Sequence, residues 1–315
     1  MKAILLEKAG GVEQLKLTDI PEPVLNENEV LIQTKAISIN PVDVKARANE
    51  KTLDWLFGTQ RPVILGWDIS GEVVAAGSDV TRFKKGDAVF GMINFPGSGK
   101  GYAEYVAAPE DQLAMKPSEI SHEEAAATTL AALTAWQALV AADPVGKGDK
   151  VLIHAGAGGV GHFAIQIAKN LGAYVVATSS GKNREFILSL GADAHIDYTT
   201  DNFDEVLNDI DFVLDTVGGN VLERSVTVTR PGGRIITLPS SSFSEEAKTA
   251  AAAKNIDLKQ IMVQSSGQDM QSLAAWLQEG RLKAKVAAVY PFEELAKAHL
   301  QVETGRTVGK VIVTL

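Results

Sequence analysis

The stretch "VLIHAGAGGVGHFAIQIAKNLGA" (residues 151–173) decides the fold of this chain. Apolar residues lead into glycines at 156, 158 and 161, and an amphipathic segment follows. Its apolar positions 160, 163, 164, 167, 168 and 171 repeat with helical spacing, and Gly172 ends it. A strand, a G-x-G-x-x-G loop and a helix in this order predict a βαβ unit whose loop holds the phosphates of a dinucleotide.

Each glycine of this loop has a physical role in that interpretation. Gly156 and Gly158 let the backbone turn sharply and approach a pyrophosphate, and Gly161 lets the helix pack closely on the strand. The N-terminus of the helix adds free N–H groups and a partial positive charge. A purely structural turn is the alternative, which the flanking strand and helix disfavour. The predicted pyrophosphate site comprises Gly156, Gly158, Gly159, Val160 and Gly161.

The end of the next predicted strand favours NADPH as the cofactor. NAD sites usually place an acidic residue there, about 20 residues after the glycines. This chain has "TSSGKNR" (178–184) instead, with no acidic residue before Glu185. We therefore predict that Ser179, Ser180 and Lys182 hold the 2′-phosphate of NADPH. The alternative is that Lys182 and Arg184 are ordinary solvated charges on a helix.

The remaining pattern predicts an α/β chain with two domains. Strands are predicted at 150–155, 173–178, 194–198, 211–217, 234–239 and 258–264, and their alternation with helices is typical of a parallel, doubly wound sheet. Before residue 121, short β-like runs punctuated by Gly and Pro indicate a β-barrel or rolled sheet. One continuous helix is predicted from the capping box of Ser121 and Glu124 to about residue 142. We assign residues 1–121 to the first domain, 122–266 to the dinucleotide-binding domain, and 267–315 to a return to the first domain.

Composition excludes several classes of protein. A chain of 315 residues is too long for one ordinary hydrophobic core, which supports two domains. A net charge of −9 without a basic run argues against nucleic acid as a partner. The absence of cysteine excludes disulfides, thiolate nucleophiles and cysteine-ligated zinc. No stretch has the length of a signal peptide or a membrane span, so we expect a cytoplasmic protein with no membrane partner.

Several stretches, in the same order along the chain, resemble the medium-chain dehydrogenase/reductase superfamily, in its zinc-free NADPH:quinone oxidoreductase branch. They are "AISINPVDVKAR" (36–47), "PVILGWDISGEVVAAGSDVTRFKKGDAVFG" (62–91), "GYAEYVAAP" (101–109), "LTAWQAL" (133–139), residues 151–173, "LGADAHIDY" (190–198) and "VGKVIV" (308–313). The resemblance covers essentially the whole chain. It implies a GroES-like β-barrel catalytic domain and a Rossmann domain built on a six-stranded parallel sheet.

The same stretches depart from those of the zinc alcohol dehydrogenases. Those enzymes carry a Cys before a conserved Asp in the first stretch and Gly-His-Glu in the second. Here Asn40 stands in place of the Cys, and Trp67 and Asp68 stand in place of the His and Glu. The four-cysteine lobe that holds a structural zinc is also absent, so we expect no metal.

Without a Lewis acid, the resemblance implies hydride transfer from NADPH to a quinone or an α,β-unsaturated carbonyl, because conjugation activates the acceptor carbon of these substrates. Two alternatives remain: an enoyl-thioester reductase, which needs a basic entrance for the phosphates of its carrier, and a cofactor-binding redox sensor with little turnover. The resemblance also implies a homodimer formed through edge strands.

Further site residues are expected at several positions. The resemblance implies that Asn40 orients the nicotinamide, and it places Asn40 and Trp67 in the catalytic site. Additional cofactor contacts are expected from Thr134, Tyr198, Val217, Gly218, Leu238 and Lys310. An apolar substrate site is expected from Trp55, Phe57, Trp67 and Phe95, beside the glycine-rich loop 94–101.

Simpler roles remain open for four of these side chains. Trp67 could fill the space of the missing metal site, Tyr198 could pack at a strand end, and Lys310 could be solvated. Thr134 could bond its own helix backbone. His154, beside the glycine loop, is expected to be a structural histidine whose ring is satisfied by the backbone.

Overall fold

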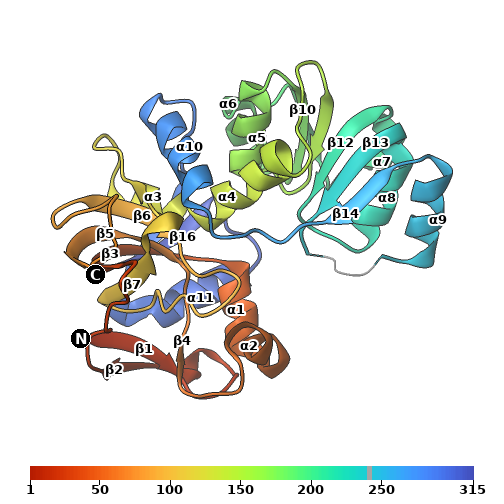
Figure 1. Ribbon diagram of the computed structural model, residues 1–315. Helices are drawn as coiled ribbons and strands as arrows, with labels where there is room; N and C mark the ends of the chain where they lie inside the picture. Colours follow the sequence, from red (N-terminus) through yellow and green to blue (C-terminus); the bar gives the residue numbers. More distant parts are fainter. Residues whose placement is uncertain (240–242) are drawn as a thin grey trace. The chain divides into compact units, whose positions relative to one another are not determined.

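The computed structural model describes residues 1–239 and 243–315 and divides the chain into two compact units (Figure 1). Unit 1 comprises Met1–Leu133 and Val263–Leu315, and unit 2 comprises Thr134–Met262. The sequence pattern places the boundaries at 121 and 266 instead. The first boundary differs because the helix α3 (His122–Ala127) packs on strands of unit 1.

Unit 2 is built on a six-stranded sheet in the order β11-β10-β9-β12-β13-β14, and every pair in it is parallel. The strands are β9 (Lys150–Ile153), β10 (Tyr174–Ser179), β11 (Ala194–Asp197), β12 (Ile210–Asp215), β13 (Thr229–Thr237) and β14 (Asp257–Gln260). The chain reverses direction across the sheet at β9, so the order is that of a doubly wound Rossmann fold. The fold predicted for residues 150–264 is confirmed.

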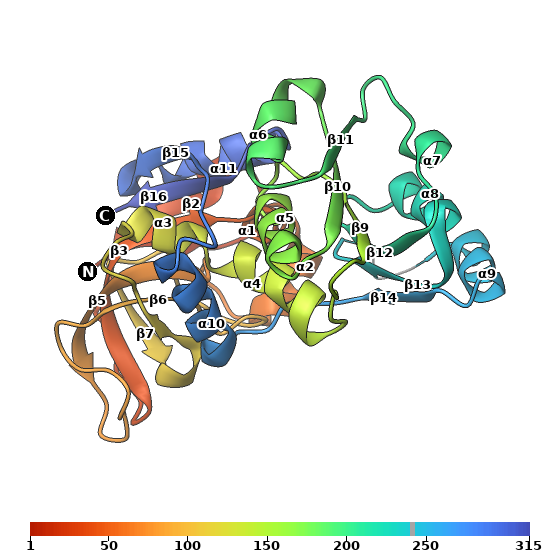
Figure 2. The ribbon, with the colours of Figure 1, turned by 90° about the horizontal axis from the view of Figure 1, so that it is seen from above.

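Helices cover both faces of this sheet (Figure 2). They are α5 (Gly161–Asn170), α6 (Arg184–Ser189), α7 (Phe203–Val206), α8 (Asn220–Val228) and α9 (Glu245–Ala253). On one face, Leu152, Val176 and Val213 of the sheet pack in one cluster with Leu222 of α8 and Ala251 of α9. On the other face, the space around Gly156 is bounded by side chains of β10, α5 and α6. Both faces are buried, which explains the continuous apolar runs of the central strands.

The helix predicted from 121 to 142 is interrupted. The structure has α3, then α4 (Leu130–Trp136), then a π-helical turn at Gln137–Ala141. At the interruption, Thr128 Oγ1 donates to the carbonyl of Glu124 and Thr129 Oγ1 donates to the carbonyl of Ala126. The first amide of α4, that of Leu130, donates to the carboxylate of Asp68 at 3.0 Å. A second N-cap supplied by a distant carboxylate starts a new helix here.

Unit 1 contains two sheets. The smaller has the order β2-β1-β4, and the larger has the order β15-β16-β3-β5-β6-β8, with β7 paired to β3 off this path. The strands are β1 (Lys2–Leu6), β2 (Leu15–Asp19), β3 (Glu29–Ile39), β4 (Val63–Ile64), β5 (Asp68–Ala76), β6 (Ala88–Met92), β7 (Tyr105–Pro109), β8 (Ala114–Met115), β15 (Val286–Pro291) and β16 (Lys310–Thr314). The helices are α1 (Pro41–Ala48), α2 (Glu50–Phe57), α3, α10 (Gly267–Gln278) and α11 (Leu295–Glu303).

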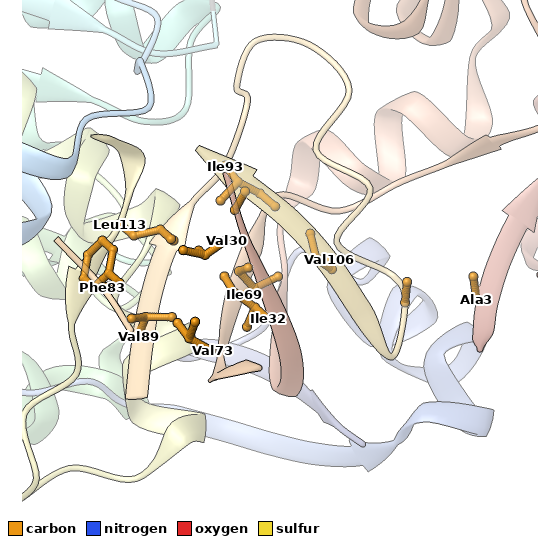
Figure 3. Packing of buried hydrophobic residues seen from close by; sticks show 12 residues of the cluster. Ala3, Val30, Ile32, Ile69, Val73, Phe83, Val89, Ile93, Val106 and Leu113 are labelled. Atoms are coloured by element: carbon orange, nitrogen blue, oxygen red, sulfur yellow. The ribbon is translucent and has the colours of Figure 1, made fainter. Parts of the chain in front are cut away.

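The long strand β3 organises unit 1. Along one edge its first half pairs with β7 and its second half with β16, while β5 pairs along the other edge. The sheet curls around a cluster of buried side chains that includes Val30, Ile32 and Ile69 (Figure 3). The pairing of β16 with β3 puts the C-terminal segment in the same sheet as the N-terminal strands. No helix in the described part of the chain is long and apolar enough to cross a membrane.

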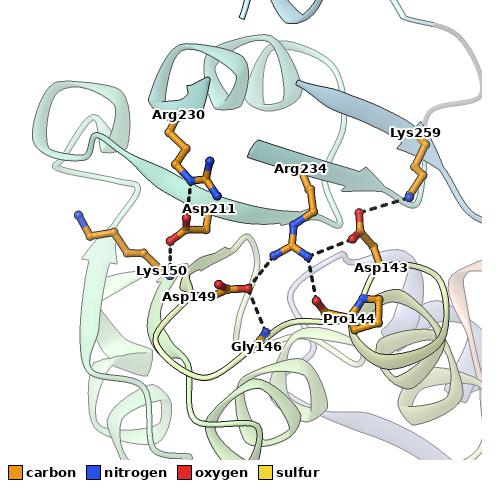
Figure 4. A network of polar contacts seen from close by, with 9 residues as sticks. All are labelled: Asp143, Pro144, Gly146, Asp149, Lys150, Asp211, Arg230, Arg234 and Lys259. Atoms are coloured by element: carbon orange, nitrogen blue, oxygen red, sulfur yellow. Dashed lines mark hydrogen bonds and ion pairs between the residues drawn. The ribbon is translucent and has the colours of Figure 1, made fainter. Parts of the chain in front are cut away.

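A polar network joins the loop before β9 to strands β13 and β14 (Figure 4). Arg234 of β13 donates to Asp143 at 3.0 Å, to Asp149 at 2.6 Å and to the carbonyl of Pro144 at 2.8 Å. Lys259 lies 3.2 Å from the second oxygen of Asp143. Because these carboxylates are mostly buried, each depends on its cationic partner.

We predict that Arg234→Gln lowers the free energy of unfolding by about 2 kcal/mol, because it leaves two mostly buried carboxylates short of a partner. The matched control is Lys248→Gln, which removes an exposed ion pair with Glu245 and should cost less than about 0.5 kcal/mol. Urea unfolding of both variants measures the difference. Equal losses in the two variants would contradict the importance of the network.

Candidate functional site

Residues 154–160 form the loop between β9 and the N-terminus of α5. Two bonds from the end of β10 hold it: the amide of Gly156 donates to the carbonyl of Thr178 at 2.8 Å, and the amide of Ala155 donates to Thr178 Oγ1 at 3.3 Å. The first amides of a helix have no partner within the helix, so α5 directs N–H groups at this loop. The loop therefore has the form of an anion-binding turn.

The three glycines of the fingerprint differ in what a side chain would meet. A Cβ atom at Gly161 would lie 2.3 Å from the carbonyl oxygen of Ala155, and one at Gly156 would lie 2.9 Å from both Ala177 and Ile187. Those two positions are glycine because the protein itself fills the space. A Cβ atom at Gly158 would meet only the carbonyl of Ala155, at 3.2 Å. The contact at Gly158 is looser than those at Gly156 and Gly161, so the packing of the protein accounts less fully for a glycine there.

The residues predicted to hold a 2′-phosphate lie at the end of β10, but they are unequally accessible. Ser179 is buried, and its hydroxyl lies 2.8 Å from Nε2 of His195. Ser180 is half-buried and accepts a bond from Asn183 at 3.1 Å. Lys182 is exposed, so of the three residues predicted for the phosphate its side chain is the most open to a ligand. Tyr198, a separately predicted cofactor contact, directly follows β11 and has an exposed fraction of 63%.

Asp197 is a residue of this region that the sequence interpretation missed. Its carboxylate lies so close to Gly181 that a Cβ atom there would be 2.2 Å from Oδ2. It accepts bonds from the amide and hydroxyl of Thr199, at 3.0 and 2.7 Å, and these bonds lower the pKa of Asp197. An acidic group therefore does lie beside the end of β10. It comes from the neighbouring strand β11, where Asp197 pairs with Ser179, and the sequence that directly follows β10 does not indicate it.

A second missed residue, Asp215, ends β12 with a fully buried carboxylate. It accepts bonds from the amides of Val217 and Gly218, both at 2.9 Å, and from the hydroxyl of Thr237 at 2.7 Å. The amide of Leu238 donates to the backbone carbonyl of Asp215 at 2.9 Å. Asp215 thus fixes three predicted cofactor contacts at the carboxyl edge of the sheet: its carboxylate holds Val217 and Gly218, and its backbone carbonyl holds Leu238.

His154 is structural, but its partners differ from those expected. The ring is buried, with Nδ1 3.2 Å from the hydroxyl of Thr178 and Nε2 3.0 Å from that of Ser225. Two side-chain hydroxyls, not the backbone, satisfy it. Burial lowers the pKa of His154 to about 4, against the opposing attraction of Asp215.

In unit 1, Asn40 follows β3 and is the N-cap residue of α1, and its carboxamide lies between two buried charges. Asn40 Nδ2 donates to Asp68 at 2.7 Å, and Asn40 Oδ1 accepts a bond from Lys310. Lys310 is 3% exposed and lies 3.7 Å from the Asp68 carboxylate. The solvated lysine considered as an alternative is therefore wrong. Burial raises the pKa of Asp68 and lowers that of Lys310, and the charge of each partner opposes the shift of the other.

The Lys310–Asp68 ion pair is part of a larger group of buried polar residues. Asp43 of α1 accepts a bond from the amide of Asn40 at 2.7 Å, and burial together with the nearby Asp68 raises the pKa of Asp43 to about 7. The hydroxyl of Tyr102 lies 2.9 Å from Nε2 of His299. Burial lowers the pKa of His299 to about 3, so its ring is neutral.

The aromatic residues expected at the substrate site are partly together. Trp67 packs against Phe57 and Phe95, with ring centroids 5.6 and 5.2 Å apart, and its indole N–H donates to the carbonyl of Gly97 at 2.7 Å. Trp67 has no exposed surface, so the structure favours the alternative in which it fills space and holds loop 94–101. Phe57 lines a cavity of about 740 Å³ in unit 1, and Trp55 is exposed.

Two predicted cofactor residues are more enclosed than their proposed roles suggest. Thr134, in α4, is 6% exposed, and Asn40 is 1% exposed.

Across the described ranges 1–239 and 243–315, no group of three or more His, Cys, Asp or Glu side chains is arranged to hold a metal ion.

We predict that Gly158→Ala lowers the melting temperature less than Gly161→Ala does and weakens NADPH binding at least about tenfold, because the added methyl group lies where a pyrophosphate has to approach. The control, Gly161→Ala, should destabilise the fold by about 1–3 kcal/mol through its clash with Ala155. Thermal unfolding and fluorescence titration separate the two effects. Full NADPH affinity in Gly158→Ala would refute the assignment of the loop.

His154 should make stability fall in acid. In the folded chain its ring stays neutral down to about pH 4, whereas the unfolded chain binds a proton below the ordinary pKa of 6.5. The unfolded state then holds more protons, so its free energy falls relative to the folded state by about 1 kcal/mol per pH unit between these values. In His154→Gln this contribution to the slope disappears, while that of His299 remains. Urea unfolding from pH 7 to pH 4 tests this; parallel curves for the two proteins would contradict it.

Comparison with known proteins extends these observations. Two family models match: "Alcohol dehydrogenase GroES-like domain" over residues 26–118 and "Zinc-binding dehydrogenase" over residues 190–313. A 2-methylene-furan-3-one reductase of Solanum lycopersicum is 36% identical over 99% of this chain and 79% of its own length. A chloroplastic NADPH-dependent alkenal/one oxidoreductase of Arabidopsis thaliana is 34% identical with the same coverage.

A solved structure of the quinone oxidoreductase of Coxiella burnetii superposes with a TM-score of 0.92, at 36% identity, covering 100% of this chain and 99% of that one. This similarity covers the whole length of the chain, so it includes the Rossmann sheet, the glycine loop and the GroES-like unit. The chain belongs to the medium-chain dehydrogenase/reductase superfamily, in its quinone oxidoreductase branch.

Proposed function

We propose that this protein is an NADPH-dependent oxidoreductase that transfers hydride to a quinone or an α,β-unsaturated carbonyl. The observation that carries the proposal is the glycine loop, where Gly156 and Gly161 are required by packing and Gly158 leaves room for a ligand. The names of the similar proteins, an enone-type reductase, an alkenal/one oxidoreductase and a quinone oxidoreductase, support the substrate class.

The residues at the carboxyl edge of the Rossmann sheet fit a dinucleotide. Gly158, Gly159 and Val160 are half-buried at the start of α5, where helix amides are available to phosphate oxygens. Val217, Gly218 and Leu238 are held by Asp215 at the ends of neighbouring strands. When bound, NADPH supplies the hydride. The protein binds and orients it, and we propose direct roles toward the cofactor for Thr134 and Asn40. For the buried Lys310 we propose an indirect role, through its bond to Asn40.

The choice between NADPH and NADH depends on Lys182 and Asp197. The exposed ammonium of Lys182 attracts a 2′-phosphate, with Ser179 and Ser180 as neighbouring hydroxyls. The carboxylate of Asp197 beside Gly181 repels one. We propose that the attraction between Lys182 and the 2′-phosphate is stronger than the repulsion from Asp197. The carboxylate of Asp197 already accepts two hydrogen bonds from Thr199, which reduces its repulsion of a phosphate.

A zinc ion, which the description of one matched family implies, does not fit this chain. The positions that carry ligands in zinc alcohol dehydrogenases hold the amide of Asn40 and the indole of Trp67, neither of which supplies a thiolate or imidazole. The ammonium of Lys310 bonds to Asn40 and lies 3.7 Å from Asp68, so a second cation there would meet like charge. We therefore propose a reaction that needs no metal, in which conjugation of the substrate stabilises the developing negative charge.

Phe57 lines the cavity of unit 1, and we propose that it contacts an apolar, planar substrate there, while Trp67 packs against its ring and Phe95 packs against Trp67. A homodimer and a cytoplasmic location remain part of the proposal, and light scattering of the purified chain tests the first of them.

The proposed function is tested by mixing the purified chain with NADPH and either 1,2-naphthoquinone or a small alkenal, and following the absorbance at 340 nm. Oxidation that depends on the acceptor and is lost in Gly158→Ala is expected. Faster turnover of crotonyl-CoA than of the free enone would point to a thioester reductase instead. Tight NADPH binding without turnover on any acceptor would refute the proposed reaction.

We predict that Lys182→Ala raises the KM for NADPH about tenfold while leaving the KM for NADH nearly unchanged, since only NADPH carries the 2′-phosphate. Asp197→Asn should act in the opposite direction and lower the KM for NADPH. Lys248→Ala, on the distant helix α9, is the matched control for loss of a surface cation. Equal changes for both cofactors in Lys182→Ala would show that Lys182 does not recognise the phosphate.

A further inference from the structure

Lys310 is a buried cation with two hydrogen-bond acceptors and one carboxylate around its amine. The acceptors are the carbonyl of Ile39 at 3.2 Å and the amide oxygen of Asn40, and the carboxylate of Asp68 lies 3.7 Å away as an ion-pair partner. These oxygens suit a protonated amine, which has three donors and no lone pair. The contacts therefore describe an ammonium ion enclosed by protein.

Opposite charges fix the direction of the Asn40 carboxamide. An ammonium only donates and a carboxylate only accepts, so Asn40 Oδ1 has to face Lys310 and Nδ2 has to face Asp68. Nδ2 also lies 3.4 Å from the carbonyl of Ser38. Both N–H bonds of the carboxamide are thereby directed at protein groups, and its oxygen accepts the bond from Lys310.

The Asp68 carboxylate joins this arrangement to the rest of unit 1. Its Oδ2 faces Asn40 and Lys310, and its Oδ1 accepts the bond from the amide of Leu130 that starts α4. Asp68 has no exposed surface. Groups from β3, β5, α4 and β16 thus meet at one carboxylate, which a buried cation has to balance.

Asn40 and Asp68 lie in two sequence stretches that resemble those of the zinc alcohol dehydrogenases, but their side chains differ from the ones those enzymes have at the same positions. Asn40 stands where those enzymes have a Cys before the conserved Asp, and Asp68 stands where they have the Glu of Gly-His-Glu. The cation next to these two positions in this chain is the ammonium of Lys310, brought from the C-terminal strand.

We propose that the Lys310 ammonium is the permanent cation of this site, that it excludes a divalent metal, and that with Asp68 it fixes the direction of the Asn40 carboxamide. Lys310 and Asp68 are positioning residues that act through Asn40. Their effect on hydride transfer rests on the function proposed above, whereas the exclusion of metal and the direction of the amide do not.

The first experiment measures metal content. The wild-type chain is purified with zinc in excess, desalted and analysed by native mass spectrometry, with Asp68→Asn in parallel. No stoichiometric zinc in the wild type is the expected result. One zinc per wild-type chain that is lost in Asp68→Asn would overturn the proposal.

The second experiment follows the Asn40 side-chain amide by NMR on ¹⁵N-asparagine-labelled protein, with the signal assigned by its loss in Asn40→Leu. The double variant Lys310→Met/Asp68→Asn removes both charges together, so neither is left buried alone. Its Asn40 amide protons should exchange with solvent at least about tenfold faster than in the wild type. The control, Lys169→Met/Asp193→Asn, removes an ion pair of unit 2 and should leave the signal unchanged. Unchanged exchange in the first variant would refute the positioning role.

If the double variant does not fold, ¹⁵N-lysine labelling of the wild type decides the question, with Lys310 assigned by its loss in Lys310→Arg. A protected –NH₃⁺ signal is expected, and a rapidly exchanging or neutral amine would refute the proposal.

Kinetics provide the readout for catalysis. In Lys310→Met/Asp68→Asn, kcat should fall about tenfold while the dissociation constant of NADPH changes less than about threefold, because the glycine loop is untouched. An equal loss in binding and turnover would indicate a merely structural role. If the wild type shows no turnover at all, the proposed function fails, and the metal and NMR experiments still decide this inference.

Discussion

The buried carboxylate of Asp68 is the constraint on which unit 1 depends. Removing a carboxylate from water is costly unless it gains compensating bonds and an opposite charge. Asp68 gains both: Asn40 and Leu130 donate to it, and Lys310 supplies the positive charge. These partners come from positions 40, 130 and 310, so a single side chain ties together the end of β3, the start of α4 and the C-terminal strand.

In unit 2 the corresponding constraint is steric. Gly156 and Gly161 are required because Ala177, Ile187 and the carbonyl of Ala155 occupy the space around them. This close packing brings α5 against the sheet and leaves the half-buried residues 158–160 at the helix N-terminus. Asp215 is a second buried carboxylate that orders backbone groups, as Asp68 does in unit 1. It accepts hydrogen bonds from the amides of Val217 and Gly218 at the end of β12. In each unit a buried carboxylate thus fixes backbone amides: that of Leu130 at the start of α4 in unit 1, and those of Val217 and Gly218 after β12 in unit 2.

Much of the fold could be predicted from local patterns. The six strands of unit 2 and the position of the glycine loop follow from apolar runs and helical periodicity, which are properties of neighbouring residues. The broken helix at 128–129 could not be predicted, because the group that starts α4 is Asp68, 62 residues earlier in the chain. Likewise, Asp197 lies on the strand next to β10, so its approach to Gly181 depends on strand order in the sheet.

The candidate site was predictable in its residue types but not in its contacts. The glycine spacing and the loss of the Cys and His positions could be seen in the sequence. The pairing of Lys310 with Asn40 and Asp68 joins residues 270 and 242 positions apart, through the pairing of β16 with β3, and no local signal marks it. Trp67 was predicted as a substrate contact together with Phe57 and Phe95, yet these two rings pack against it and it has no exposed surface.

The central claim is that a side-chain ammonium, and not a metal, balances Asp68 beside Asn40. A crystal structure of the protein grown with NADPH and excess zinc, with anomalous data collected on both sides of the zinc absorption edge, tests it most directly. The account predicts dinucleotide density at residues 156–161 and no anomalous peak next to Asp68. A zinc peak coordinated by Asp68, with the Lys310 side chain displaced from Asn40, would contradict it.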